Sequence, residues 1–234
     1  ALKEQPFTQL LEVGPGTGAL TKNLIKIPDV DFKAVELDRE KVAFLKKKYP
    51  VLEDKIIEQD FLQMEKPFEG SFTVIGNFPY NISTQILIKI LDWKDEVPVI
   101  IGMFQKEVAE RAAASPGGKI YGVTSALLQP FYHIEYLFDV PPTSFDPPPK
   151  VNSGVIKLTR KTETLKVASD KAYKSLVKMA FNQRRKTLRN ATRSLFTPEV
   201  LADPIFNRRA ETLSIDEYAA LSFKMTGFGN SSEV

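Results

Sequence analysis

The chain of 234 residues has no cysteine and only one histidine, His133. Without cysteine, disulfides, thiolate metal sites and a cysteine nucleophile are excluded. A single histidine excludes multi-histidine metal sites and argues against a Ser-His triad. No apolar run approaches the roughly 20 residues of a membrane helix, and the first residues do not form a signal peptide. We therefore expect a soluble, cytoplasmic protein that binds no metal. We also expect a monomer.

Charge is distributed unevenly between the two ends of the chain. Residues 1–160 carry 19 basic and 21 acidic side chains, whereas residues 161–234 carry 13 and 8. A near-neutral first region followed by a basic C-terminal region suggests that the first catalyses a reaction and the second binds a polyanion. Ordinary surface variation explains a difference of this size equally well.

Short β-rich runs alternate with segments of helical spacing through the first 160 residues. This alternation predicts a parallel sheet with helices on both faces, and hence an α/β domain over residues 1–160. Only Pro141–Lys150 separates the last two runs, which favours an antiparallel return. The expected strands are Gln9–Val13, Phe32–Leu37, Lys55–Gln59, Phe72–Ile75, Val97–Phe104, Glu135–Val140 and Val151–Thr159.

The remaining residues, 161–234, have a helical pattern. One apolar stripe runs from Leu176 to Leu195, and another comprises Ile215, Tyr218, Ala219 and Phe223. We predict a small all-helical domain with a mobile tail at residues 227–234.

A glycine-rich loop follows the first expected strand. The segment from Glu12 to Gly18 reads Glu-Val-Gly-Pro-Gly-Thr-Gly, with glycines at 14, 16 and 18, and Glu36 ends the next strand. Glycines let the backbone approach a ligand closely, and a carboxylate at the second strand end can accept hydrogen bonds from ribose hydroxyls. The spacing fits both a dinucleotide fingerprint and the S-adenosylmethionine loop of class I methyltransferases.

A second motif, Asn77-Phe78-Pro79-Tyr80, follows the fourth expected strand. The exocyclic amine of adenine is a poor nucleophile because its lone pair is delocalised into the ring. The Asn77 side-chain carbonyl and the Phe78 main-chain carbonyl can accept both N–H bonds and direct the lone pair at an activated methyl group. Pro79 stiffens the loop, and Tyr80 offers a ring for stacking. The alternative is a turn with Tyr80 in the core.

Asp60 and Phe61 end the third expected strand. Asp60 can accept a hydrogen bond from the adenine amine of a cofactor, and Phe61 can place apolar surface beside that ring. Alternatively, Asp60 caps a helix. We favour the binding role, because three successive strand ends would then each contribute a ligand group.

These motifs resemble the ribosomal RNA adenine dimethylases over nearly the whole chain. More specific segments follow: Gln105–Arg111, Tyr121-Gly122, Val140–Ser153, Phe181–Asn190 and Arg209–Ser214. The resemblance implies a seven-stranded sheet with an antiparallel last strand, and dimethylation of two adjacent adenosines in a small-subunit rRNA loop near the 3′ end. It also implies that Leu37 contacts the cofactor, that Phe145 stacks on the flipped adenine opposite Tyr80, and that Lys150 contacts phosphate.

The chain departs from the family pattern at two places. The family carries a Gln-x-Phe-Leu segment ahead of the glycine loop that helps enclose the cofactor, whereas the thirteen residues before Gly14 do not match it and include no initiator Met. We expect a truncated chain with weaker cofactor binding. Phe78 replaces the more usual Leu or Ile, with little expected effect because its contribution is main-chain.

Residues 182–193 contain five basic and no acidic side chains. On one helix, Arg185, Arg189 and Arg193 would share a face and follow an RNA backbone by neutralising phosphates. The predicted RNA-binding residues are Lys150, Arg184, Arg185, Lys186, Arg189 and Arg193. A solvated helix face is the alternative.

Three other functions remain open. A large-subunit rRNA adenine methylase shares the first motifs but not the segments at 183–190 and 209–214. A non-catalytic RNA-binding assembly factor needs the basic segment but not Asn77. A nicotinamide oxidoreductase leaves the Asn77–Tyr80 motif unexplained.

Overall fold

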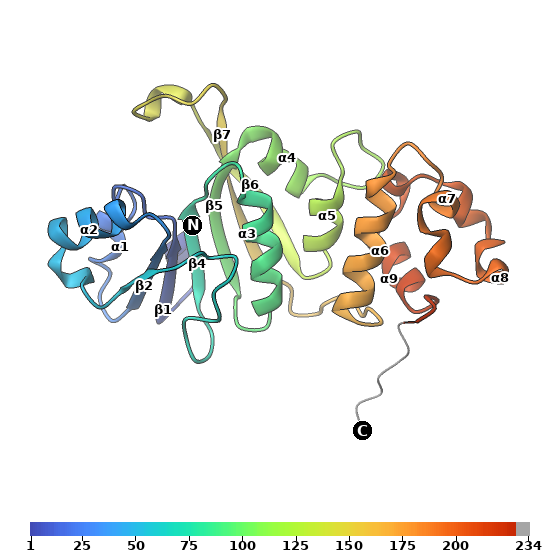
Figure 1. The fold of residues 1–234 in the computed structure, drawn as a ribbon, viewed down its shortest axis with the longest axis horizontal. Coiled ribbons are helices and arrows are strands. Elements are labelled where there is room, and N and C mark those ends of the chain that lie inside the picture. The colour runs from blue at the N-terminus through green and yellow to red at the C-terminus, as the bar shows by residue number, and fades with distance from the viewer. Residues whose placement is uncertain (228–234) are drawn as a thin grey trace. The chain divides into compact units, whose positions relative to one another are not determined.

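The computed structural model describes residues 1–227, and residues 228–234 of the predicted mobile tail lie outside the described range (Figure 1). Within the described range, two compact units comprise residues 1–110 with 133–160, and residues 111–132 with 161–227. The predicted first domain, 1–160, included residues 111–132, which the structure groups instead with the C-terminal helices. One reason is a buried hydrogen bond of 2.8 Å from the Tyr173 hydroxyl to the carbonyl of Ala126.

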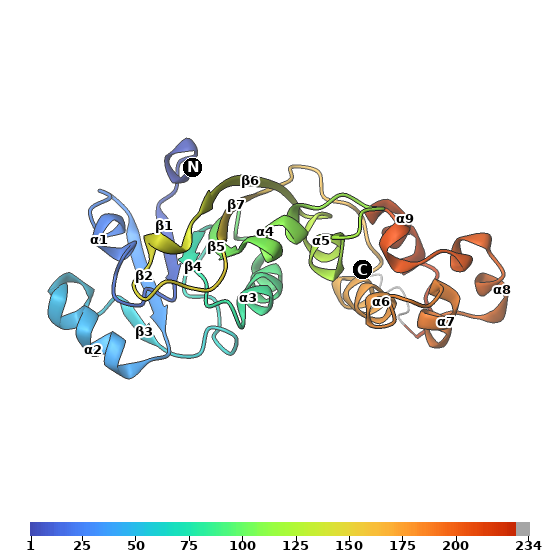
Figure 2. The same ribbon diagram turned by 90° about the horizontal axis from the view of Figure 1, so that it is seen from above.

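The first unit is built on a seven-stranded sheet of order β3-β2-β1-β4-β5-β7-β6 (Figures 1 and 2). Strands β1 to β5 pair in parallel, and β7 is antiparallel to β5, as the resemblance implied. All seven predicted strands are present, with ends that differ by three residues at most. The strands are β1 (Gln9–Val13), β2 (Asp31–Glu36), β3 (Ile56–Glu58), β4 (Thr73–Asn77), β5 (Val99–Gln105), β6 (Tyr132–Val140) and β7 (Ser153–Arg160).

Both faces of the central strands are buried. Successive side chains of a strand point to opposite faces. Leu10 of β1 and Ile75 of β4 belong to an apolar cluster with Leu24 and Leu45, which come from α1 and α2. Leu11 is directed to the other face and is also fully buried. The apolar runs in the sequence are therefore continuous rather than alternating, as expected for parallel strands covered on both sides.

Nine α-helices are present in the described range. They are α1 (Thr21–Leu24), α2 (Arg39–Lys48), α3 (Ser83–Ile90), α4 (Lys106–Ala113), α5 (Val123–Leu128), α6 (Asp170–Asn182), α7 (Leu188–Thr192), α8 (Pro198–Leu201) and α9 (Ile215–Ser222). The side chain of Asp38 caps α2 by accepting from the amides of Glu40 and Lys41. Within residues 1–227, no helix is long and apolar enough to cross a bilayer, and no group of acidic or histidine side chains is suited to hold a metal ion.

The second unit contains an apolar core of its own. Leu176 and Leu188 from the first predicted stripe, together with Tyr218 from the second, are fully buried. The prediction was wrong for Phe223, which is 54% exposed. Its helix, α9, ends at Ser222, so Phe223 serves as the C-cap instead of continuing the buried stripe.

Candidate functional site

The carboxyl ends of β1, β2 and β4 meet at a cavity of about 450 Å³ in the first unit. Parallel strands place their carboxyl ends at one edge of a sheet, which is why loops far apart in the sequence converge here. The principal lining residues are Glu12, Gly14, Gly16, Glu36, Lys41, Asn77, Pro79 and Phe145. The structure thus joins the glycine loop, the second strand end and the Asn77 motif around one space, as the strand order predicted. The proline loop joins them there, as the family resemblance implied.

The glycine loop lies against the Asn77 motif. Gly14 and Gly16 have φ values of 68° and 58°, a left-handed conformation that favours glycine. A Cβ on Gly14 would lie only 3.5 Å from Cδ of Pro79. The first amide of the loop, on Gly14, donates to the carbonyl of Val35 at 3.0 Å, which holds the loop against β2. The two loops therefore form adjoining walls of one cavity.

Glu36 links the end of β2 to the glycine loop. Its Oε2 accepts from the amide of Gly16 at 3.2 Å, and its Oε1 accepts from the amides of Leu37 and Asp38 at 3.0 and 3.1 Å. A carboxylate offers about four acceptor positions, so these three bonds leave room for a ligand hydroxyl. The ribose-binding role of Glu36 stays a prediction, and the structure adds that Glu36 holds the glycine loop in place.

Glu12 is a buried carboxyl group in the wall of the cavity. Its side chain is 1% exposed and accepts a hydrogen bond of 2.7 Å from the Thr21 hydroxyl. Burial raises the pKa of Glu12 to about 7, because leaving water disfavours the charged form. The only sign of the Thr21 contact in the sequence is a hydroxyl at the start of the helix after the loop.

We predict that Glu12→Gln removes a pH dependence of folding stability. Between the unfolded value of 4.5 and a folded pKa of about 7, the native state holds a proton that the unfolded chain has lost, so stability falls as pH rises. The difference of about 2.5 pKa units corresponds to about 3 kcal/mol. Urea unfolding at pH 4.5 and 8 should show this loss in the wild type and in the exposed-site control Glu65→Gln, but not in Glu12→Gln. An equal loss in all three proteins would contradict the assignment.

The side chain of Asn77 is exposed at the cavity and makes no hydrogen bond to any other residue of the described range. The next side chain, Phe78, is 1% exposed, and its ring packs against Phe104 with the centroids 5.1 Å apart. The Phe78 amide donates to the carbonyl of Met103 at 3.2 Å. The loop is thus fixed through Phe78, while the neighbouring amide of Asn77 is left free for a ligand.

Two glycines on adjacent strands make room for the Phe78 ring. Gly76 of β4 and Gly102 of β5 are register partners. A Cβ on Gly76 would lie 2.6 Å from the ring and 2.5 Å from the carbonyl oxygen of Val13, and a Cβ on Gly102 would lie 2.5 Å from the ring. Glycine inside a strand weakens the strand, and it often marks a place where another group approaches the backbone closely. This signal in the sequence could have identified Gly102 as such a place. The expected main-chain role of Phe78 is therefore accompanied by a side-chain role.

We predict that Gly102→Ala lowers the free energy of unfolding by about 1–3 kcal/mol, the usual cost of overpacking a core. Phe78→Leu should recover part of this loss, because it removes the nearest ring atoms. A methyl group on Gly102 would also lie 2.6 Å from the ring of Phe104, but that side chain can shift. The same change should recover less in Gly76→Ala, because the obstacle there is the backbone carbonyl of Val13, which cannot move aside as easily. Chemical denaturation of Gly102→Ala and Gly76→Ala, each with and without Phe78→Leu, tests this. Wild-type stability of Gly102→Ala would show that the sheet accommodates the methyl group without cost and would contradict the prediction.

Four predicted cofactor residues do not line the cavity. Asp60 accepts from the amide of Leu62 at 2.9 Å within a turn, and no helix begins there, so the alternative interpretation as a helix cap is wrong. The ring of Phe61 is 5% exposed and packs edge-to-face on Trp93, so it presents little surface to a ligand. Leu37 is 65% exposed, and Gly18 packs under Leu45. Their predicted ligand roles stay untested predictions.

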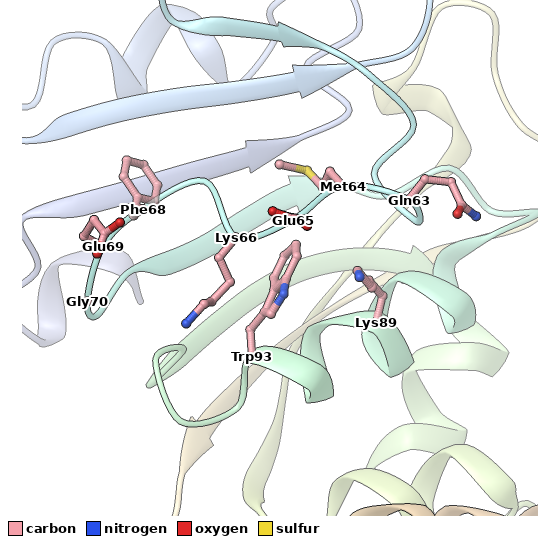
Figure 3. Close-up of a pocket in the computed structure, with 9 residues that line it drawn as sticks. All are labelled: Gln63, Met64, Glu65, Lys66, Phe68, Glu69, Gly70, Lys89 and Trp93. Carbon is pink, nitrogen blue, oxygen red and sulfur yellow. The ribbon is translucent and has the colours of Figure 1, made fainter.

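A separate cavity of about 540 Å³ lies between the loop after β3 and the end of α3 (Figure 3). Its wall includes Lys66 and Lys89, but Lys66 pairs with Glu96 and the Lys89 ammonium lies 5.1 Å from the ring centre of Trp93. Figure 3 shows Trp93 between these two lysines. No residue predicted to act in binding or catalysis lines this space, so it does not extend the candidate site.

The single helix expected over residues 182–193 is wrong. Helix α6 ends at Asn182, Gln183 has non-helical backbone angles, and the chain turns before α7 begins at Leu188. The amide of Lys186 donates back to the carbonyl of Gln183 at 2.7 Å, and that of Leu188 donates to Arg208, so the helical hydrogen bonds are replaced. The arginines predicted to share one helix face therefore lie on a turn, on α7 and on the 3₁₀ turn that follows.

The basic side chains of this segment differ in their surroundings. Arg185, Lys186, Arg189 and Arg193 are exposed. The guanidinium of Arg184 donates to the carbonyl of Lys119 and lies 3.7 Å from a carboxylate oxygen of Glu211. Arg184 thus has structural partners inside the second unit. In the first unit, Lys150 is exposed, as a phosphate contact requires.

Comparison with known proteins gives a consistent result. A family model described as ribosomal RNA adenine dimethylase matches residues 1–224. A ribosomal RNA small subunit methyltransferase A from Cytophaga hutchinsonii is 49% identical over 94% of this chain and 87% of the relative. One of the same name from Phocaeicola vulgatus is 51% identical over 93% of this chain and 79% of the relative.

Two solved structures share the fold. A dimethyladenosine transferase from Plasmodium falciparum superimposes with a TM-score of 0.70 at 23% identity, covering 92% of this chain and 89% of the other. The 23S rRNA methyltransferase ErmE gives 0.64 at 21% identity, covering 94% and 92%. The first unit accordingly has the α/β fold of class I methyltransferases. With the family model matching nearly the whole chain, the protein belongs to the ribosomal RNA adenine dimethylase family.

Proposed function

We propose that this protein transfers two methyl groups from S-adenosylmethionine to the exocyclic amine of each of two adjacent adenosines. The target lies in a small-subunit rRNA loop near the 3′ end, and the reaction takes place in the cytoplasm during subunit maturation. Membership of the adenine dimethylase family supports the reaction, and the relatives named small subunit methyltransferase support the substrate. The observation that carries the proposal is the free Asn77 amide at the cavity shared with the glycine loop.

The cavity fits S-adenosylmethionine in size and charge. Its volume of about 450 Å³ is in the usual range for small-molecule sites. The cofactor supplies a methyl group on a positively charged sulfur, and it also carries an ammonium group. Two carboxyl groups, on Glu12 and Glu36, line the cavity and suit these charges. Gly14 and Gly16 allow the cofactor to approach the backbone, and Glu36 can accept from ribose hydroxyls.

The acceptor side of the cavity can orient an adenine without a strong base. In the first transfer, Asn77 Oδ1 and the Phe78 carbonyl oxygen each accept a hydrogen bond from one N–H of the amine, which favours tetrahedral nitrogen and aims its lone pair into the cavity. Each transfer leaves S-adenosylhomocysteine, and the methylated nitrogen loses one proton to solvent. In the second transfer one N–H remains, and one of the two oxygens accepts it. Tyr80 offers a ring face, and Phe145 lines the same cavity from the proline loop. An adenine inside a paired helix cannot reach this position, so the target base must be splayed out of a loop.

The alternatives account for fewer observations. For a large-subunit methylase, the support is the likeness to ErmE, which at 21% identity concerns the fold alone. The relatives of about 50% identity are named small subunit methyltransferases. A nicotinamide dinucleotide would bring a pyrophosphate to a cavity lined by Glu12 and Glu36. A non-catalytic assembly factor would not require an unpaired Asn77 amide in the cavity that the glycine loop also lines.

The proposed function is tested by incubating the protein with labelled S-adenosylmethionine and unmethylated small subunits. Digestion of the rRNA and nucleoside analysis should give N6,N6-dimethyladenosine at two adjacent positions. Large subunits, treated in parallel, should remain unlabelled. Label in the large subunit alone, or no dimethyladenosine from either subunit, would overturn the proposal.

We predict that Asn77→Ala lowers the rate of methyl transfer by about 100-fold or more, the usual effect of removing one aligned polar group from a catalytic site. Cofactor binding should change little, because the glycine loop and Glu36 remain intact. Single-turnover rates and calorimetric binding of S-adenosylmethionine separate the two effects. Asn23→Ala, at an exposed position on α1, is the control. Unchanged turnover in Asn77→Ala would refute the role assigned to its carbonyl.

We predict that the double variant Arg185→Glu, Arg189→Glu weakens binding of small-subunit rRNA and flattens its salt dependence. Each lost phosphate contact lowers the slope of log affinity against log salt by about 0.7–0.9. Lys46→Glu with Lys47→Glu, in the run of three lysines that ends α2, makes the same change in charge and should leave the slope unchanged. A slope equal to that of the wild type would mean that the exposed arginines do not face the RNA.

A further inference from the structure

The Tyr80 hydroxyl is bound to a strand outside its own motif. Its oxygen lies 2.5 Å from Oγ of Ser153, the first residue of β7. Ser153 pairs with Gln105 at the end of β5, and β5 separates β7 from β4. The hydrogen bond therefore crosses the carboxyl end of β5 and joins the acceptor loop to the strand beyond it.

The two ends of Tyr80 are both held. The Ser83 hydroxyl donates to the carbonyl of Tyr80 at 3.2 Å, while Ser153 holds the phenolic end. Ser153 is fully buried, whereas Tyr80 is half-buried. A ring fixed at its backbone and at its hydroxyl has one orientation, and its exposed part can stack on a base without further ordering.

Ser153 directly follows the loop that carries the opposite wall of the acceptor site. That loop contains Phe145, which lines the cavity with Asn77. Its last residue, Asn152, accepts from the amide of Lys106 at 2.9 Å, so the loop rejoins the sheet immediately before Ser153. The residue that holds the Tyr80 ring is therefore next in the chain to the residue through which the Phe145 loop rejoins the sheet.

We propose that Ser153 is a positioning residue for the acceptor adenine, acting through the Tyr80 hydroxyl. This proposal rests on the proposed function, since it specifies how one wall of the acceptor site is fixed. Ser153 sets the plane of the Tyr80 ring relative to Asn77, so that a stacked adenine presents its amine to the two carbonyl acceptors. It touches neither the base nor the cofactor.

The test is a double-mutant cycle between Ser153→Ala and Tyr80→Phe, measured by single-turnover methyl transfer to small subunits. Both changes remove one hydroxyl, and Tyr80→Phe keeps the ring. Each should slow methyl transfer about tenfold, the size of effect that a small misplacement of a reacting group has. The double variant should be no slower than either single one. Ser153→Thr, which keeps a hydroxyl, should recover most of the rate.

The affinity for S-adenosylmethionine should stay at the wild-type value in every variant, which separates misplacement from loss of the fold. Ser222→Ala removes a buried hydroxyl in the second unit and should methylate like the wild type. Wild-type rates in Ser153→Ala, or effects of the two changes that multiply, would overturn the proposal. If Ser153→Ala does not fold, a wild-type rate of methyl transfer in Tyr80→Phe would also overturn the proposal. Failure of the wild-type protein to form dimethyladenosine would instead refute the proposed function.

Discussion

The geometry of the candidate site depends on how closely the Phe78 ring packs against the backbone of two neighbouring strands, β4 and β5. Phe78 is directed away from the cavity and lies on Gly76 and Gly102, where a Cβ would come within 2.6 Å of the ring. Because a ring in such a space has no alternative position, the residues on either side of Phe78 are fixed as well. Asn77 can therefore leave its amide free at the cavity without losing its orientation. The cost of two glycines within strands is offset by a rigid loop at the place where the chemistry requires one.

Charge explains why the same sheet edge suits a cationic cofactor. The glycine loop resembles that of dinucleotide-binding proteins, and its geometry alone does not separate the two kinds of ligand. Glu36 suits the ribose of either ligand. Glu12 makes the difference, because it adds a second carboxyl group to the wall of the cavity. Burial of Glu12 also makes its ionisation unfavourable, so a positively charged ligand and an ionised Glu12 stabilise each other. Cofactor binding and proton release from Glu12 are thus expected to be coupled.

Much of this arrangement could be predicted from the sequence, because it follows from local signals. The seven strands are apolar runs ended by turn residues, and the glycine loop and the Asn77 motif follow two of them directly. The predictions failed where contacts between segments distant in the sequence determine the local structure. A turn replaces the helix expected beyond Asn182 because the amide of Leu188 pairs with Arg208, and Arg184 has partners on two other segments. Likewise, no local pattern shows that Tyr80 reaches Ser153, 73 residues away.

The central claim is that two carbonyl oxygens of one loop hold the amine of the target adenine. The most direct measurement is a crystal structure of the protein with S-adenosylhomocysteine and a short RNA loop containing the two adenosines. The account predicts that the amine nitrogen of a flipped adenine lies within about 3.2 Å of both Asn77 Oδ1 and the Phe78 carbonyl oxygen. An adenine bound in the cavity with its amine directed away from both oxygens would contradict it.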